Sequence, residues 1–392
     1  MAVATLTSVR TTARRWLPLA LVYLAVGLST AMAGPFLALF LDSAVHAGPL
    51  RVAVFLATAP VSAVIVATLV GKVSDRLPAR RTVLLVTALA GCAGTTVTAF
   101  ARDYGVLLGA TVTLTALSGA MMPQAFAYAR EALAGAEKVA MTMSALRTLF
   151  SIAWVAGPPL AAVLLQAGGF TLVYGFAAVM YAVAALVVLV ALPATPAARP
   201  AGAPVRATGS DAPRLVIRLS IAVFVLTRCA GSLAVQDLAL FVPHELGGDV
   251  GDAGLLLGLC AALEIPLMLG FGLLAARVPV RRLLVVGTAC GLAYLLIVTL
   301  AHSIWELAAG QLLNAASIAA LTGLGVTYVQ DMLPRHPGRA STLFSNTFPA
   351  GTMLAGPVLG AAQHLGYRMP YAVGAVLCAA ALGLLFLGRK TS

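Results

Sequence analysis

The feature that most constrains this chain is a series of long segments without a single Asp, Glu, Lys, Arg or His residue. A helix needs about 20 residues to cross the hydrocarbon core of a bilayer. The segments of about that length or longer are Leu17–Leu41, Val52–Gly71, Thr82–Ala101, Tyr104–Ala129, Leu283–Ala301, Leu307–Gln330, Ala340–Gln363 and Met369–Gly388. The chain is therefore expected to be an all-α membrane protein.

Four further spans bring the expected number of transmembrane helices to twelve. The stretch from Thr148 to Leu192 is too long for one span, and Gln166, Gly168 and Gly169 interrupt it. The fifth and sixth helices are therefore predicted at Val139–Leu165 and Phe170–Leu192, and the seventh and eighth at Leu219–Val242 and Ala253–Ala276.

Composition excludes several other classes of protein. Charged residues make up 10% of the chain, whereas soluble domains carry about 25%. The net charge of +12 does not indicate nucleic-acid binding, because the basic residues lie in short loops between apolar runs. The five cysteines all fall in apolar runs without a CxxC pair, so we expect no disulfide, no metal site and no cofactor.

Basic residues also predict the orientation. With a cytoplasmic N-terminus, the inner segments would hold twenty Lys and Arg residues and the outer loops only Arg51, Arg102 and Arg368. The positive-inside rule therefore places both termini in the cytoplasm. The proline-rich stretch 193–218 is predicted to be a cytoplasmic linker between an N-terminal bundle, 1–192, and a C-terminal bundle, 219–392.

The two halves repeat each other at an offset of about 200 residues. The segment Gly71-Lys-Val-Ser-Asp-Arg-Leu-Pro-Ala-Arg-Arg81 and the segment Gly272-Leu-Leu-Ala-Ala-Arg-Val-Pro-Val-Arg-Arg282 share the spacing of Gly, Arg, Pro and the Arg pair. Ala156-Gly-Pro158 likewise matches Ala355-Gly-Pro357. Two parallel six-helix repeats with a site at their interface are an architecture of transporters.

The Gly71–Arg81 segment resembles the signature loop of the major facilitator superfamily, with Pro78 where a second Gly is usual. A narrower resemblance to the bacterial sugar efflux transporters rests on four stretches: Pro123–Glu131, Leu146–Ala161, Leu263–Pro266 and Gln330–Asn346. The resemblance implies a monomer in the bacterial inner membrane that exports sugars or glycosides, such as lactose, in exchange for protons. It does not specify the sugar.

The same resemblance implies a cytoplasmic gate at the signature loop. Its expected residues are Gly71, Asp75, Arg76, Arg80 and Arg81, with Arg130 and Glu131 as a matching latch. The alternative is a solvated charge cluster that only fixes the topology of the chain.

Four charged residues lie inside the predicted spans: Arg147, Arg228, Asp237 and Glu264. A charge at the bilayer centre costs roughly 3 kcal/mol or more, so such groups face a cavity or a partner. All four are predicted to take part in proton coupling or in the gate, Asp237 as a proton or sugar ligand. The superfamily resemblance implies that the fifth and eighth helices adjoin, and Arg147 and Glu264 could then form a proton-sensitive gate. The alternatives are a permanent ion pair that fixes helix packing and, for Asp237, simple contact with water at the outer face.

Sugar recognition calls for amides, carboxylates and an aromatic face. The candidates, which lie in the predicted helices, are Gln124, Tyr128, Arg147, Ser151, Trp154, Asp237, Glu264, Gln311, Asn314 and Asn346. Arg147, Ser151 and Trp154 form one helical stripe. For each amide the alternative is hydrogen bonding between helices, which is common in membranes.

Other functions remain open at this point. A drug/proton antiporter would have the same architecture, and a membrane sensor without flux is a further alternative. No HExxH, GxSxG or nucleotide-binding loop occurs in the chain, so an enzyme is not expected.

Overall fold

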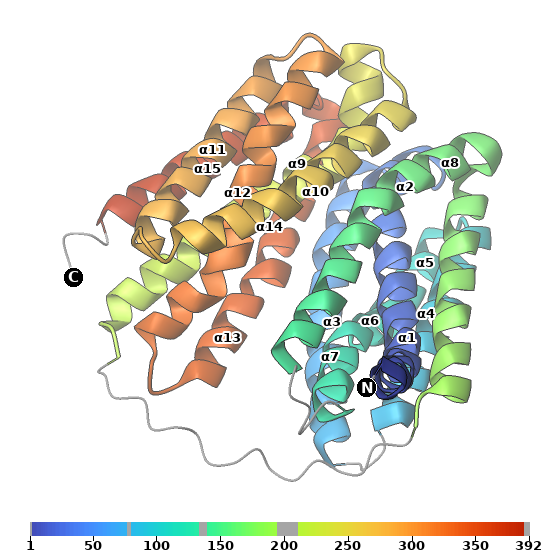
Figure 1. Cartoon of the computed structure of the whole chain (residues 1–392). Coiled ribbons are helices and arrows are strands. Elements are labelled where there is room, and N and C mark those ends of the chain that lie inside the picture. Colours follow the sequence, from blue (N-terminus) through green and yellow to red (C-terminus); the bar gives the residue numbers. More distant parts are fainter. Residues whose placement is uncertain (1, 77–79, 133–138, 194–210, 388–392) are drawn as a thin grey trace. The chain divides into compact units, whose positions relative to one another are not determined.

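The computed structural model of the protein describes residues 2–76, 80–132, 139–193 and 211–387. Within these ranges the only regular secondary structure is helical (Figure 1). The chain divides into two compact units: unit 1 comprises residues 1–34 and 62–202, and unit 2 comprises residues 35–61 and 203–392. The bundle boundaries expected from the sequence stay a prediction, and most of the expected linker lies outside the described ranges.

Unit 1 is built from seven segments and part of an eighth. They are α1 (Ala2–Ala33), α4 (Arg80–Phe100), α5 (Tyr104–Ala110), the π-helical turn η1 (Thr111–Thr115), α6 (Ala116–Gly119), α7 (Met121–Ala132) and α8 (Val139–Ala191). The helix α3 (Pro49–Arg76) is shared by the two units.

Unit 2 holds the remaining helices. They are α2 (Leu37–Ser43), α9 (Arg214–Leu246), α10 (Val250–Leu274), α11 (Val280–Leu300), α12 (Ile304–Met332), α13 (Pro337–Ser345), α14 (Thr347–Leu365) and α15 (Met369–Leu387). The helix α9 begins inside the stretch that was expected to be linker. It continues through Gly231 without a break, so that Arg228 and Asp237 lie on different faces.

The predicted turn between the fifth and sixth spans is confirmed. Although α8 runs from Val139 to Ala191, Gly168 and Gly169 inside it have non-helical backbone angles. The φ angle of Gly169 is +67°, a conformation that a side chain with a Cβ rarely adopts. Glycine at this position therefore lets the chain reverse direction between two spans.

Three spans that were predicted as continuous are interrupted. The first is broken between Ala33 and Leu37. The other two breaks lie just before a proline: one helix ends at Ser345 and restarts at Thr347, before Pro349, and η1 and a break at Ala120 precede Pro123. A proline ring clashes with the carbonyl group four residues earlier and offers no N–H to it, so Ser345 and Gly119 mark the ends of their helices.

The surface is suited to lipid. Nine helices in the described part are long and apolar enough to cross a membrane, or ten if Leu17–Ala33 and Leu37–Ser43 form one interrupted span. The stretch Thr148–Ala191 counts once among them although it contains the turn at Gly169. Large apolar side chains such as Val190, Leu273 and Leu300 are exposed, as expected where hydrocarbon replaces water. The total of twelve spans stays a prediction.

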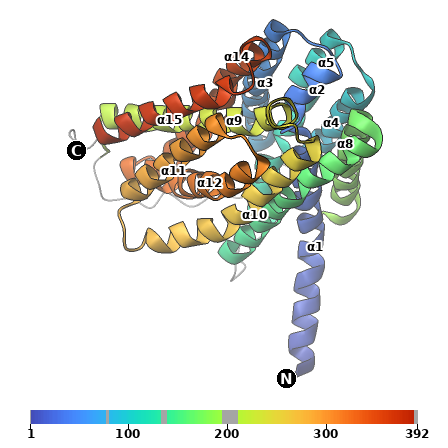
Figure 2. The ribbon, with the colours of Figure 1, turned by 90° about the horizontal axis from the view of Figure 1, so that it is seen from above.

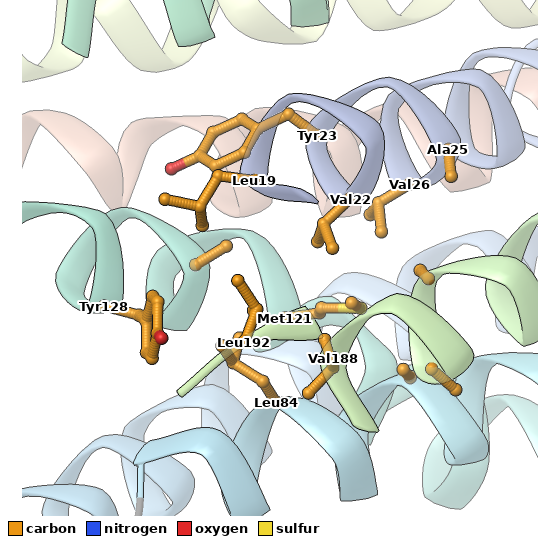
Figure 3. Packing of buried hydrophobic residues seen from close by; sticks show 14 of the residues in the cluster. Leu19, Val22, Tyr23, Ala25, Val26, Leu84, Met121, Tyr128, Val188 and Leu192 are labelled. Atoms are coloured by element: carbon orange, nitrogen blue, oxygen red, sulfur yellow. The ribbon is translucent and has the colours of Figure 1, made fainter. Parts of the chain in front are cut away.

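A hydrophobic cluster joins four helices of unit 1. Leu19, Val22 and Tyr23 of α1 pack with residues of α4, α7 and the last part of α8 (Figure 3). Their partners in the figure include Leu84, Met121, Tyr128, Val188 and Leu192. The cluster fixes these four helix ends relative to one another.

Small residues allow close helix packing in both units. A Cβ at Gly157 of α8 would lie 2.6 Å from Ala31 Cβ of α1, and one at Gly287 of α11 would lie 2.5 Å from Ala320 Cβ of α12. Such contacts replace the hydrophobic driving force that helices lack in lipid. In unit 2, α11 lies beside both α12 and α15, and α15 lies beside α9 (Figure 2).

We expect Gly351→Ala in α14 to destabilise the protein by about 1–3 kcal/mol, because overpacking of a tight contact costs that much. A Cβ at Gly351 would lie 2.5 Å from Arg228 Cβ and 2.7 Å from Cys229 N, on the backbone of α9. Thermal unfolding in detergent measures the effect. The matched control is Gly383→Ala in α15, where a Cβ would meet nothing within 4 Å; equal unfolding temperatures of the two variants would contradict the prediction.

Candidate functional site

The guanidinium of Arg228 is the centre of a polar cluster in unit 2. Its Nη2 donates a hydrogen bond of 2.7 Å to Thr322 Oγ1 on α12, and its Cζ lies 3.8 Å from the centroid of the Phe348 ring on α14. A guanidinium over an aromatic face is stabilised by about 2 kcal/mol when it is desolvated. The Nε of Arg228 is buried and finds no hydrogen-bond acceptor among the residues that the structure describes.

Glu264 on α10 supplies the opposite charge. It is partly buried and interacts electrostatically with Arg228. The sequence predicted Arg147 as the partner of Glu264, but the side chain of Arg147 lies outside what the structure describes. Within unit 2, Arg228 is therefore the cation that balances Glu264.

A cavity of about 40 Å³ borders the same arginine. Helices α9, α11, α12 and α15 enclose it, and its polar lining includes Thr227, Arg228, Tyr294, Asn314 and Ser317. A water molecule needs about 10–15 Å³ of such volume together with two or more polar partners. The cavity thus has room and partners for more than one water.

The two amides predicted on α12 bind neighbouring helices. Gln311 is fully buried and its Nε2 donates to Tyr294 Oη on α11 at 3.3 Å. Asn314 Nδ2 lies 3.0 Å from Gln311 Oε1 and 3.4 Å from Cys260 Sγ on α10. For Gln311 and Asn314 the structure shows the alternative named above, hydrogen bonding between helices.

Asp237 on α9 is completely buried, with 0% of its surface exposed. The expectation that it might only reach water at the outer face is therefore wrong. Neither of its carboxyl oxygens has a hydrogen-bond partner in the described part of the chain. The Tyr371 hydroxyl on α15, which is equally buried and equally without a described partner, interacts electrostatically with Asp237.

In unit 1, Gln124 and Tyr128 of α7 contact the signature segment and the end of α8. Ser74 Oγ donates to Gln124 Oε1 at 2.7 Å, and Arg80 Nη1 lies 3.5 Å from the same oxygen. Tyr128 Oη donates to the Pro193 carbonyl at 2.8 Å. Because the protein's own groups occupy both side chains, sugar binding by either one stays a prediction.

Arginines of the repeated segment make the same kind of contact in each unit, although from different positions of the repeat, because Arg81 corresponds to Arg282 and Arg281 to Arg80. Arg81 donates to the carbonyls of Val188 and Leu189 at the end of α8, and Arg281 donates to the carbonyl of Leu385 at the end of α15. The last carbonyls of a helix lack partners within the helix, so an arginine from the repeat motif caps the final helix of each unit.

The remaining predicted residues are only partly described. The side chains of Asp75, Arg76, Arg130 and Glu131 lie outside what the structure describes, so the predicted latch stays a prediction. A Cβ at Gly71 would meet nothing within 4 Å. Ser151 and Trp154 of α8 are partly buried, and Asn346 is exposed at the break between α13 and α14. Groups of three or more potential metal ligands are not found in the described part.

Sequence reasoning did not name Thr322, Phe348, Tyr294 or Tyr371. Tyr294 and Tyr371 carried a detectable signal, because each places a polar hydroxyl inside an otherwise apolar span. Phe348 lies two residues after Asn346, but nothing in the neighbouring sequence distinguishes it from a lipid-facing residue. Its contact with Arg228 depends on the fold.

Comparison with known proteins places this geometry in a family. The family model of the Major Facilitator Superfamily matches residues 19–241 and 219–392. Solved structures of the nucleoside transporter NupG and of a peptide transporter POT in complex with sulfate are similar in fold, with TM-scores of 0.78 and 0.80 at 13% and 12% identity. The alignments cover 96% of this chain, and 98% and 94% of those chains respectively.

Curated relatives are closer in sequence. A Deinococcus radiodurans protein, provisionally named a sugar efflux transporter, is 38% identical over 95% of this chain and 98% of its own. Sugar efflux transporter A of Escherichia coli K12 is 33% identical over 93% of each chain. Sugar efflux transporter A of Dickeya chrysanthemi is 33% identical over 90% of this chain and 91% of its own. The chain therefore belongs to the major facilitator superfamily and, within it, to the sugar efflux transporters.

Proposed function

We propose that the protein exports a neutral sugar or glycoside from the cytoplasm in exchange for protons, by alternating access, as a monomer in the bacterial inner membrane with both termini inside. The substrate class rests on the relatives, which are named sugar efflux transporters. The observation that supports the coupling is the electrostatic interaction of the partly buried Glu264 with Arg228, because an ionisable group in a membrane span has a functional role by default.

The charge balance at Arg228 supports a simple coupling scheme. While Glu264 is ionised, the carboxylate and the guanidinium attract each other and offer one acceptor and several donors to the hydroxyl groups of a sugar. When Glu264 takes up a proton, the pair loses its attraction and the partly buried cation loses its counter-charge. Sugar and proton then bind in alternation, which is the requirement for antiport.

The membrane potential adds to the driving force under this scheme. A neutral sugar that leaves while one proton enters moves one net positive charge inward. Such a movement releases about 2.3 kcal/mol for each 100 mV of potential that is negative inside. Export is therefore expected to respond to the potential as well as to the pH gradient.

Glu264→Gln tests the coupling. In vesicles loaded with radiolabelled lactose and placed in acidic medium, we expect the wild-type protein to accelerate efflux. The variant lacks the titratable carboxyl, so its gradient-driven efflux should be at least tenfold slower than that of the wild type. It should still exchange lactose across the membrane without a gradient. Asp331→Asn, which alters an exposed carboxyl at the end of α12, is the matched control. Full gradient-driven efflux by Glu264→Gln would contradict the assignment.

The same assay separates the other candidate functions. Efflux of cationic dyes in place of lactose would identify a drug/proton antiporter. Lactose binding without any flux of lactose or dye would identify a sensor. Either result would overturn sugar export while leaving the family assignment intact.

Asn346 and Gln311 provide a second test, which concerns the sugar ligands. Asn346 is exposed and lies two residues from Phe348, whereas Gln311 is fully buried. We expect Asn346→Ala to raise the KM for sugar about 5- to 10-fold, the effect of one lost hydrogen bond of about 1 kcal/mol. Gln311→Ala should instead lower the unfolding temperature with little change in KM. The reverse pattern would remove Asn346 from the site.

A further inference from the structure

Asp237 is a buried acid that the proposed coupling at Glu264 does not use. Its carboxyl oxygens are both without a hydrogen-bond donor in the part of the chain that is described, and its side chain is fully buried. An unpaired carboxylate is so costly to bury that the group binds a proton instead. Asp237, deep inside unit 2, is therefore expected to hold a proton.

Among the described residues, none of the groups that interact electrostatically with Asp237 is a cation. They are Glu245 on α9, Tyr371 on α15, and Tyr367 in the loop between α14 and α15. The nearby Arg368 guanidinium lies over the Phe241 ring at 5.6 Å. Glu245 forms an ion pair with Arg368, whose Nε lies 2.9 Å from Glu245 Oε2. What remains near Asp237 is two hydroxyl groups, each of which can accept one proton and release another.

Tyr371 packs against the turn of α9 that follows Asp237. Its ring packs edge-on against Phe241, with centroids 5.0 Å apart, and Phe241 lies one helical turn from Asp237 on the same face of α9. The hydroxyl of Tyr371 is fully buried, is not hydrogen-bonded to any described group, and interacts electrostatically with Asp237 and with Tyr294 on α11.

Tyr294 connects this pair with the cavity beside Arg228. Its hydroxyl is held by Gln311 at 3.3 Å, and its side chain lines the cavity together with Arg228, Asn314 and Ser317. Waters in that cavity would also satisfy the Nε of Arg228, which finds no acceptor within the described residues. Arg228 in turn interacts electrostatically with Glu264, so the cavity connects Tyr294 with the acid proposed for coupling.

We propose, on the basis of the sugar/proton antiport proposed above, that Asp237, Tyr371 and Tyr294 form a buried proton relay to the hydrated cavity at Arg228 and Glu264. Because neither group is hydrogen-bonded to a described residue, Asp237 gives its proton to the Tyr371 oxygen through a water, while Tyr371 releases its own proton through a second water toward Tyr294. Tyr294 in turn passes its hydroxyl proton to a cavity water. Each O–H bond that breaks is replaced by one that forms, both tyrosines end neutral, and Asp237 is left as a carboxylate until it is reprotonated.

Reprotonation is expected from the loop between α14 and α15. Tyr367 in this loop is partly exposed, its ring lies 4.6 Å from that of His244, and it interacts electrostatically with Asp237 and with Asp42 on α2. Burial first, and the charge of Asp42 next, raise the pKa of Tyr367. Its hydroxyl therefore stays neutral at physiological pH and can hand a proton inward.

Tyr371→Phe is the direct test, because it removes the hydroxyl and keeps the ring against Phe241. In lactose-loaded vesicles we expect gradient-driven efflux to fall at least tenfold, while lactose exchange without a gradient stays within twofold of wild type. Tyr294→Phe should behave in the same way. The control is Tyr328→Phe, the same chemical change at a partly buried position beside Phe224 in unit 2, for which we expect wild-type efflux.

The outcomes separate the relay from the antiport on which it rests. If the wild-type protein shows no gradient-driven efflux, the antiport itself fails. If the proton gradient accelerates lactose efflux by the wild type and accelerates it equally in Tyr371→Phe and Tyr294→Phe, the relay is overturned and the antiport stands. If both variants lose lactose exchange as well as gradient-driven efflux, the relay is also overturned, because the hydroxyls would then serve the structure alone.

Infrared spectroscopy tests the proton on Asp237 independently of transport. The wild-type protein at neutral pH should show the carbonyl band of a protonated carboxyl group in a dry environment, and Asp237→Asn should lack it. Glu264→Gln is the matched control and should retain that band. A spectrum that is unchanged by Asp237→Asn would mean that Asp237 is ionised, which the relay does not allow.

Discussion

The architecture of unit 2 depends on the stabilisation of one guanidinium inside a membrane span. Hydrocarbon cannot solvate Arg228, so the protein must supply what water would provide. Three helices contribute to this stabilisation, because Thr322 on α12 accepts a hydrogen bond, the Phe348 ring on α14 offers its face, and Glu264 on α10 attracts the charge. Helix packing and charge balance are consequently linked at this residue, and a change in the protonation of Glu264 acts directly on the helices that surround Arg228.

The sequence was sufficient for the class of fold because bilayer thickness imposes a length on every span. It also located the turn at Gly168 and Gly169, of which Gly169 has a backbone angle that a residue with a Cβ rarely adopts. It failed at Asn346 and Ala120, because length and hydropathy do not show how Pro349 or Pro123 affects the carbonyl four residues earlier. Rules of local geometry could have found both breaks, whereas the total of twelve spans, which rests on length and composition, stays a prediction.

The candidate site was harder to predict, since its partners come from different helices. Glu264, Arg228 and Asp237 were found because any charge in a span is conspicuous, but the contact of Arg228 with Phe348 has no signature in the sequence. Gln311 shows the opposite difficulty: an amide in a span has the same appearance whether it binds a sugar or, as here, Tyr294 on the next helix. Chemical type restricts the choice of candidates, and only the packing of helices selects among them.

The two repeats show how an arginine could be introduced without loss of packing. Arg228 corresponds in the internal repeat to Gly27 of the first span. In unit 1 the small residue lies on α1, where a Cβ at Gly27 would be 2.9 Å from Ala153 Cβ of α8. In unit 2 the small residue is on the opposite helix, where Gly351 of α14 packs on the backbone of α9 at Arg228. The close approach of the two helices is thus kept, while the glycine has changed sides and left α9 free to carry a long charged side chain. We infer that Gly351 and Arg228 depend on each other: without the glycine, α14 could not bring Phe348 over the guanidinium, and the arginine would lose the aromatic face that stabilises it in the membrane.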